Sequence, residues 1–503
     1  MKTPSFKFSK AAAGTAGLSP GFLMLGLFGF YALYHLVMLS RSPLPWFDET
    51  FFASIAHSLL KSGRLLLDVE PAKDPFDTGL IYGPVYFQVQ AGWLKIAGLE
   101  AFTFRLPALL CGLTVLFWFA ERMRKILRQS RLAILFILLL ALDPIFHQSL
   151  HSGRMDMMAL MWVTGALGIL LAFEEQAVKR FACLQGVLFG GFLVLAFLTT
   201  PRSLVLTAGL GALAAVRLFG RQRKAWLFFL LGALPAFVLP AAAWIFFACN
   251  GLQSWVQMYL QAGAAQRYLG VASAVSWHHI ALGLLVVWLI ACRGRRIFQG
   301  PHRVLVLICL ANVAAFYALI KGFVLYSAMV LPFVYLLCLI LLKEIQSGRC
   351  RRTALVLLTA VAAGHLNYFT AKNLVLCTQW AQRNPQVASK AVSRWIPRGS
   401  KVLGDKVYYY AVFENGSDYR YLTRKNRTGR GSFVQDFDYL IVSNDAVEEN
   451  AKEVLFYKSH FRLEEVSKIK APPFGRFAAF VNKVIVPLYD LEGSYEGTIY
   501  KRV

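Results

Sequence analysis

Charged residues are scarce in this chain, and acidic residues are the scarcest. Asp, Glu, Lys and Arg make up only 16% of the 503 residues, with 27 acidic against 53 basic side chains, whereas 57% of the chain is hydrophobic. Too little polar surface remains to cover a water-soluble globule of this size. The composition therefore excludes an ordinary soluble protein and predicts a polytopic membrane protein.

Paired cysteines and regularly spaced metal ligands are lacking as well. The eight cysteines are scattered, and only Cys249 and Cys377 are expected to be exposed on the outside, so no disulfide framework is indicated. No His/Cys spacing typical of a metal site occurs. The adjacent His278 and His279 are poorly placed to chelate one ion, and a helix start at the membrane interface is the favoured interpretation.

The net charge of +26 does not indicate nucleic-acid binding. Nucleic-acid binders concentrate Lys and Arg on one face of a soluble domain. Here the basic residues fall mostly in short connectors between apolar runs, which is typical of the cytoplasmic loops of membrane proteins. A lipid bilayer, and no nucleic acid, is therefore the expected partner.

Eleven apolar runs predict membrane-spanning helices. They lie near 21–40, 104–121, 132–150, 156–173, 182–199, 203–216, 226–248, 278–292, 304–320, 323–342 and 353–370. The first run is expected to be an uncleaved helix, because it is as long as a full span. Basic connectors all fall on one side in this scheme, which predicts a cytoplasmic N-terminus. The first loop (41–103) and the C-terminal part (371–503) are then outside, which in a bacterium means the periplasmic side of the inner membrane.

The two outer parts are predicted to be structured. Residues 51–60 and 84–96 have apolar side chains at helical spacing, as interfacial helices do. From Lys372 onward the composition is that of a soluble domain, with strand-like runs at 401–410, 439–443, 477–481 and 497–500. The expected fold is therefore mostly α: a transmembrane module over 1–370 followed by a small α/β domain over 371–503.

The adjacent carboxylates Asp48 and Glu49 follow the first span, at a predicted helix start. Acidic residues in the first turn of a helix often interact with its free N–H groups, so this pair alone is ambiguous. Ionisable groups at a membrane are costly and usually functional. The same outer rim is expected to carry a further set of polar groups: His151, Arg154, Asp156, Arg202, Lys321 and Tyr326.

A structural interpretation exists for several of these groups. Arg154 and Asp156 could simply pair with each other, Lys321 could extend toward the interface, and Asp143-Pro144 could mark a helix end. A whole cluster of carboxylates and cations on one rim is harder to explain in this way, so the cluster favours a functional site.

The order of short motifs resembles the GT-C glycosyltransferases. The chain is most similar to the group of protein O-mannosyltransferases and aminoarabinose (lipid A) transferases, and to bacterial family 39. The motifs are Trp46-Phe-Asp-Glu-Thr50, His57-Ser-Leu-Leu-Lys-Ser-Gly63, Tyr82-Gly-Pro-Val-Tyr86, Arg105-Leu-Pro107, Arg154-Met-Asp156, Leu198-Thr-Thr-Pro201 and Tyr326-Ser-Ala-Met-Val-Leu-Pro332. They cover the whole membrane part in order.

The resemblance implies a reaction. A sugar would pass from a polyprenyl-phosphate donor to a lipid, glycan or protein acceptor at the outer face, with inversion at the anomeric carbon. Asp48 matches the family's catalytic acidic position and would act as general base, with Glu49 orienting the acceptor or sharing its proton. Asp156 would position Arg154, help bind the sugar or ligate a divalent ion, since metal dependence varies among these enzymes.

The leaving phosphate would require fixed positive charge and hydrogen-bond donors. The resemblance assigns this role to Arg154, Lys321, Arg202 and Arg105, with Tyr82 and Tyr326 as donors.

Two departures from the family pattern affect the expected donor. Tyr82-Gly83 stands where lipid A relatives often carry a lysine, and Phe52 stands where they often carry an arginine. Both changes remove cations expected near the donor phosphate and argue against an aminoarabinose transferase. A transporter or flippase for a lipid-linked saccharide is the main alternative. Such proteins usually contain internal repeats and midplane sites, and neither is evident here. A non-catalytic scaffold is the third hypothesis.

Overall fold

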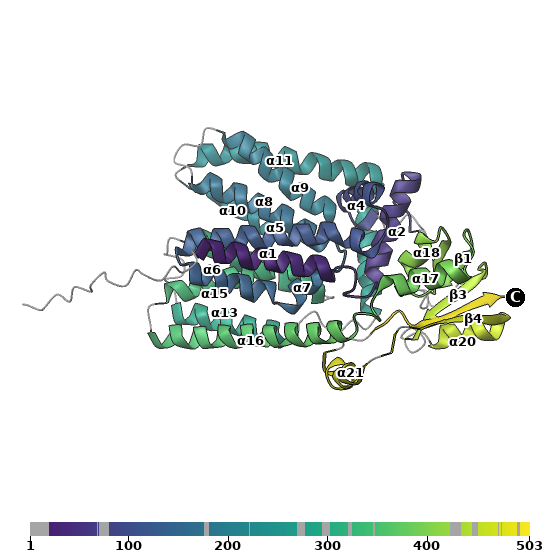
Figure 1. Cartoon of the computed structure of the whole chain (residues 1–503). Helices are drawn as coiled ribbons and strands as arrows, with labels where there is room; N and C mark the ends of the chain where they lie inside the picture. The colour runs from purple at the N-terminus through teal and green to yellow at the C-terminus, as the bar shows by residue number, and fades with distance from the viewer. Residues whose placement is uncertain are drawn as a thin grey trace, which may run out of the picture.

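The structure, a computed structural model, describes most of the chain. The described residues are 20–67, 69, 80–175, 181–220, 222–268, 277–293, 302–319, 324–345, 348–422, 434–444, 451–470, 472–473, 475–489 and 493–503. Roughly parallel helices form one long bundle, and a small sheet with its own helices sits at one end of it (Figure 1). The expected fold class, a mostly α membrane protein with a small C-terminal α/β domain, is confirmed.

Each of the eleven predicted spans coincides with a helix or with adjoining helices. These are α1 (Pro20–Met38), α5 (Ala101–Leu127), α6 (Ser130–Ala141) with α7 (Pro144–Leu150), α8 (Asp156–Glu175), α9 (Ala182–Thr199), α10 (Leu204–Val216) between η1 (Pro201–Ser203) and η2 (Arg217–Phe219), α11 (Arg223–Ala243) with η3 (Trp244–Ala248), α13 (Trp277–Arg293), α14 (Arg303–Leu319), η5 (Val324–Met329) with α15 (Leu331–Glu344), and α16 (Gly348–Thr378). A further helix, α12 (Leu252–Tyr268), follows η3.

Length and composition support a multi-pass membrane protein. Among the described residues, seven helices are long and apolar enough to cross a bilayer, or eight if α6 and α7 form one span with a 68° bend. The remaining three predicted spans correspond to α13, α14 and α15, which have 17, 17 and 14 residues. They are short for a bilayer of about 30 Å.

The bend between α6 and α7 has a local cause. Pro144 cannot continue α6, because it lacks the N–H that an inner helical turn requires. Asp143 instead caps α7, and its Oδ1 accepts hydrogen bonds from the N–H groups of Ile145 at 2.9 Å and Phe146 at 3.0 Å. Its Oδ2 accepts from the Tyr335 hydroxyl at 2.7 Å. The interpretation of Asp143-Pro144 as a helix end is confirmed.

Both helices predicted in the first loop are present. They are α2 (Phe47–Ser62) and α4 (Pro84–Ala97), which lie across the end of the bundle next to the C-terminal domain (Figure 1). The start of α2 at Phe47 places Asp48 and Glu49 inside its first turn. Gly63 ends α2 with φ +71, a left-handed conformation that favours glycine.

The C-terminal domain contains one five-stranded mixed sheet in the order β2-β1-β3-β5-β4. Its strands are β1 (Lys401–Gly404), β2 (Asp418–Tyr421), β3 (Tyr439–Ser443), β4 (Leu463–Ile469) and β5 (Gly497–Arg502). Strand β1 pairs in parallel with β2 and β3, whereas β5 runs antiparallel to β3 and β4. The helices are α17 (Pro385–Trp395), η6 (Lys406–Tyr408), α18 (Tyr409–Glu414), α20 (Ala451–His460) and α21 (Arg476–Tyr489).

Two of the four predicted strands need correction. The strand expected over 401–410 ends at Gly404, and its tyrosines lie in η6 and α18. The run 477–481 is part of the amphipathic helix α21. Helix α16 continues without a break from the membrane part to Thr378, so the expected division at 370/371 stays a prediction.

Candidate active site at the end of the helix bundle

Glu49 forms a fully buried ion pair with Arg105 of α5. The Arg105 Nε and Nη2 groups donate to the two Glu49 oxygens at 3.0 and 2.8 Å, and neither side chain is exposed. The third guanidinium nitrogen, Nη1, donates to the Leu39 carbonyl at 2.7 Å. All three nitrogens of Arg105 are thus engaged within the protein.

A residue from the C-terminal domain completes this pair. The Tyr410 hydroxyl donates to Glu49 Oε1 at 2.9 Å. Burial raises the pKa of the Glu49 carboxyl, and the Arg105 guanidinium and the Tyr410 hydroxyl offset part of that rise. Glu49, Arg105 and Tyr410 therefore connect the start of α2 to α5 and to α18. These buried contacts hold the helices in position and do not form an open binding site.

Asp48 points to a different partner and is partly accessible. Its side chain is 32% exposed, and its Oδ2 accepts a hydrogen bond from Arg154 Nη1. Arg154 in turn donates from Nε to Asp156 Oδ2 at 2.6 Å, and both of these residues are buried. Burial lowers the pKa of the Arg154 guanidinium, but the Asp156 and Asp48 carboxylates outweigh this effect and hold the pKa well above its usual value.

The segment carrying Arg154 is fixed by its backbone. The Ser152 carbonyl accepts from Trp46 Nε1 at 3.3 Å, and the Gly153 carbonyl accepts from the Tyr86 hydroxyl. Gly153 has φ +57, and a Cβ there would lie 2.7 Å from the Phe104 ring. A side chain at this position would therefore displace the turn that presents Arg154 to Asp48.

Arg202, Tyr326 and Tyr82 extend the cluster. The Arg202 guanidinium lies 3.9 Å from the Tyr326 ring centroid and 5.6 Å from that of Tyr82. Arg154 lies 4.8 Å from the same Tyr326 ring, on which both arginines converge. Cation–π contacts of this kind hold a guanidinium in place without neutralising its charge.

Several polar atoms around Arg202 lack a partner among the described residues. They are Arg202 Nη1, Thr200 Oγ1 and Ser203 Oγ, together with Asp156 Oδ1. Buried polar atoms are normally hydrogen-bonded, so a group of orphans beside a cation indicates a place for a ligand or water. The first three can donate to an anion, whereas the carboxylate oxygen of Asp156 can accept from a hydroxyl.

An apolar groove lies beside this polar cluster. Gly83 packs directly on the backbone of α9, where an added Cβ would lie 2.1 Å from the Leu198 carbonyl oxygen. Next to this contact is a shallow groove of about 480 Å³. Its lining consists of apolar residues from α4, α9, α11 and η3: Pro84, Leu198, Pro240, Ala243, Trp244, Phe247 and Ala248.

The structure brings together most of the residues singled out in the sequence. Six of them form the cluster just described: Asp48, Asp156, Arg154, Arg202, Tyr82 and Tyr326. Glu49 and Arg105 form the buried pair behind it, and Lys321 lies outside the described residues. Arg154 bridges Asp48 and Asp156, and so occupies the space between them that a shared metal ion would need.

Sequence reasoning missed the contribution of the C-terminal domain. The Tyr421 hydroxyl contacts the Thr50 hydroxyl in α2, and its backbone N–H donates to the Val69 carbonyl at 3.0 Å. Tyr410 reaches Glu49 from the same domain. The only sequence signal was a run of tyrosines, which suggested a strand.

Comparison with known proteins shows the fold. No protein-family model matches the chain, and no curated protein matches it in sequence. Among solved structures, ArnT from Cupriavidus metallidurans bound to undecaprenyl phosphate is similar, with a TM-score of 0.61 at 13% identity over 96% of this chain and 98% of ArnT. The apo state of ArnT gives a TM-score of 0.59 with the same identity and coverage.

The structure of a second protein has a similar fold. The arabinofuranosyltransferase AftD from Mycobacteria is similar with a TM-score of 0.50 and 17% identity, over 95% of this chain and 40% of AftD. At such low identities the likeness establishes the architecture alone. The chain has the GT-C fold, as the resemblance of its motifs implied.

Proposed function

We propose that the protein is an inverting glycosyltransferase that moves a sugar from a polyprenyl-phosphate donor to a lipid, glycan or protein acceptor on the outer face of a membrane. One observation carries the proposal. A partly exposed carboxylate, Asp48, lies in the same cluster as a cation with orphaned donors, Arg202, and an apolar groove begins beside them. A base, an anion site and a lipid-chain site are the three parts that this reaction needs.

The donor phosphate would bind at Arg202. Its guanidinium, the Thr200 hydroxyl and the Ser203 hydroxyl supply one positive charge and several hydrogen-bond donors. The phosphate gains negative charge as its bond to the sugar breaks, so these fixed donors would stabilise the transition state more than the ground state. The prenyl chain would lie in the apolar groove next to Pro84 and Leu198. The binding of undecaprenyl phosphate by ArnT supports this class of donor.

The acceptor would approach Asp48. The acceptor oxygen forms the new bond to the anomeric carbon and passes its proton to the Asp48 carboxylate. The bond from that carbon to the phosphate oxygen breaks, and its electron pair leaves with the polyprenyl phosphate. Arg154 holds the Asp48 carboxylate in its orientation, and Asp156 holds Arg154 from its other side. The free Asp156 oxygen would accept a hydrogen bond from the sugar.

Substitution of the base tests the proposal. Cells depleted of the protein would be complemented with the wild type, with Asp48→Asn or with Asp418→Asn, an exposed carboxylate at the start of β2 that pairs with Arg420. Masses of envelope glycolipids and glycoproteins would then be compared. Depletion should remove one sugar from an acceptor class, wild type and Asp418→Asn should restore it, and Asp48→Asn should not, because a general base contributes about 10²–10⁴ in rate.

Two outcomes would contradict the assignment. Full restoration by Asp48→Asn would show that Asp48 is not the base. Uptake of a labelled polyprenyl-linked sugar into vesicles without any transfer would instead favour a flippase. Gel filtration and thermal unfolding of the purified Asp48→Asn variant are needed to show that it folds as the wild type does.

A further inference from the structure

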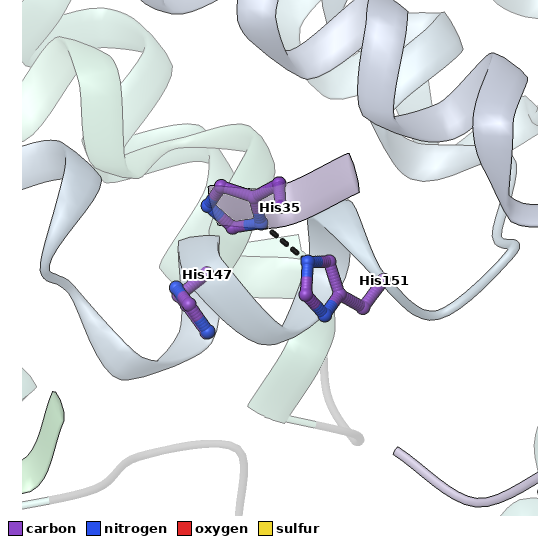
Figure 2. Close-up of side chains that lie close together, drawn as sticks. All are labelled: His35, His147 and His151. Atoms are coloured by element: carbon purple, nitrogen blue, oxygen red, sulfur yellow. Dashed lines mark hydrogen bonds between the residues drawn. The ribbon is translucent and has the colours of Figure 1, made fainter. Parts of the chain in front are cut away.

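Three buried histidines gather where α1 and α7 end (Figure 2). His35 belongs to the last turn of α1, His147 to α7, and His151 directly follows α7. Their side chains are 0%, 2% and 0% exposed. One nitrogen from each ring lies within 4.8 Å of the corresponding nitrogens of the other two. The polar cluster around Asp48 includes none of these residues.

The hydrogen bonds of the three rings are incomplete. His151 Nδ1 lies 2.8 Å from the Ser42 carbonyl and so donates to it, which leaves a lone pair on its Nε2. That Nε2 accepts a hydrogen bond from His35 Nδ1 (Figure 2), a contact that an ion bound to both rings would replace. His35 Nε2 and both nitrogens of His147 have no partner among the described residues. An unmet hydrogen bond on a buried polar atom costs about 1–3 kcal/mol, so three such atoms in one place need an explanation.

We propose that His35, His147 and His151 bind one divalent transition-metal ion of the zinc class. Neutral imidazole is a preferred ligand of such ions, and three of them with one open position is a common zinc arrangement. The Ser42 carbonyl would play the outer role that ligating histidines usually require, because it fixes the ring of His151 so that Nε2 is the ligand atom.

The geometry requires a small adjustment. A zinc–nitrogen bond of about 2.0–2.1 Å in a tetrahedron places ligand nitrogens about 3.3 Å apart. The described nitrogens span up to 4.8 Å, a difference that rotation of the imidazole rings can supply. The ligands come from α1 and from the α7 region.

Basic side chains near the three histidines determine which fourth ligand the ion requires. The buried Lys372 of α16 interacts electrostatically with all three histidines, and Arg105 does so with His151. Neutral imidazole is the form that binds a metal ion, and it carries no charge for these two cations to repel. The two cations do oppose a dication, and the three rings bring no negative charge of their own. An anionic fourth ligand such as hydroxide or chloride is therefore part of the proposal.

The ion would stabilise the position of the segment that carries Arg154. His151 opens the segment that carries Arg154 three residues later, and Ser152 in that segment accepts from Trp46. A metal shared by α1 and this segment would hold its first residue in place, and would so support the turn that presents Arg154. The ion itself has no part in sugar transfer, and the proposal does not depend on that function.

Metal content tests the proposal directly. The full chain would be purified in detergent without chelators and analysed by plasma mass spectrometry, with about one zinc per chain expected. The protein would then be stripped with a chelator and titrated with Co²⁺, whose visible absorption reports tetrahedral coordination. His147→Gln should lose the zinc and the cobalt spectrum. His460→Gln, a histidine exposed on α20, should keep both.

Clear results would overturn it. Wild-type protein that carries no stoichiometric metal and gives no cobalt spectrum excludes the site, as does His147→Gln that retains full metal. If His147→Gln fails to fold, X-ray absorption at the zinc edge of the wild type decides instead. Imidazole nitrogens in the first shell support the proposal, and sulfur or purely oxygen ligands contradict it.

Discussion

At the scale of single residues, Arg202 is expected to contribute mainly to binding of the donor phosphate. Its guanidinium lies over two tyrosine rings and forms no ion pair among the described residues, so its Nη1 is available to a phosphate. We expect Arg202→Gln to weaken the binding of undecaprenyl phosphate about 10- to 150-fold, the equivalent of a charge-assisted hydrogen bond of about 1.5–3 kcal/mol. Competition with a labelled lipid phosphate in detergent measures this change.

Arg217 provides the matched control. It pairs with Glu174 at 2.8 Å, in the connector between α10 and α11 at the opposite end of the helices. Arg217→Gln should leave lipid-phosphate binding unchanged. Equal effects of the two substitutions would show that Arg202 contributes through overall charge and not through a site.

Glu49, in contrast, is expected to contribute to the stability of the fold. Removal of one partner from a buried ion pair leaves an uncompensated charge and typically costs about 3–5 kcal/mol. We expect Glu49→Gln to destabilise the protein by about this amount, because Arg105 would lose both carboxylate contacts and Tyr410 an acceptor. Thermal unfolding in detergent should show a large fall in Tm.

A surface pair calibrates that measurement. Lys401 and Asp436 pair at 2.6 Å, but their side chains are 47% and 78% exposed, so Lys401→Gln should lower Tm far less than Glu49→Gln. The double variant Glu49→Leu with Arg105→Met should recover part of the loss, since no charge stays buried. A Glu49→Gln protein as stable as Lys401→Gln would refute the structural role of the pair.

At the scale of elements, the contact between α4 and α9 depends on a glycine. A Cβ at Gly83 would lie 2.1 Å from the Leu198 carbonyl oxygen, so Gly83→Ala must push the start of α4 away from the end of α9. We expect a loss of about 1–3 kcal/mol in stability and of most of the transfer activity, because Tyr82 and the groove would shift. Gly92→Ala, within α4 and with nothing within 4 Å, should instead gain up to about 1 kcal/mol. Thermal unfolding and sugar-transfer assays of both variants measure these changes. Equal results for the two variants would contradict this packing.

The elements also show how far a sequence can be interpreted. Each apolar run predicted as a span coincides with helix, because a segment in lipid must satisfy its own backbone hydrogen bonds. Strands in the C-terminal domain were harder. Phe477, Phe480, Val481 and Val484 are strand formers by residue type, but their spacing is helical, and α21 buries Val481 against Val375 of α16. The helical spacing of these residues is therefore a better guide to their secondary structure than their β-propensity.

The site was predictable only where its parts are carried by local motifs. Asp48 and Arg154 belong to short motifs next to spans, and the structure pairs them. Tyr410 and the His35–His147 proximity arise from packing between segments far apart in sequence, which no spacing rule reports. A histidine within the first apolar run was nonetheless a signal, because polar groups inside a membrane span are usually functional.

At the scale of the whole molecule, charge and architecture are polarised along the bundle. Helix α16 runs from Gly348 to the C-terminal domain, so Arg349, Arg351 and Arg352 lie at the end away from the site (Figure 1). Arg124 and Lys125 lie in the last turn of α5 and Arg128 directly follows it, at the same far end. Cytoplasmic loops carry such an excess of basic residues, so the candidate site and the sheet should face outward.

Reporter fusions test this orientation. Alkaline phosphatase is active only outside the cytoplasm and green fluorescent protein fluoresces only within it, so each reporter would be fused after Arg128 and after Val503 in a bacterial host. We expect fluorescence without phosphatase activity at Arg128, and phosphatase activity without fluorescence at Val503. Immunoblots must show equal expression. The reverse pattern would place Asp48 on the cytoplasmic face, where an outward-facing lipid-linked donor could not reach it, and the proposed reaction would have to be moved to the other leaflet.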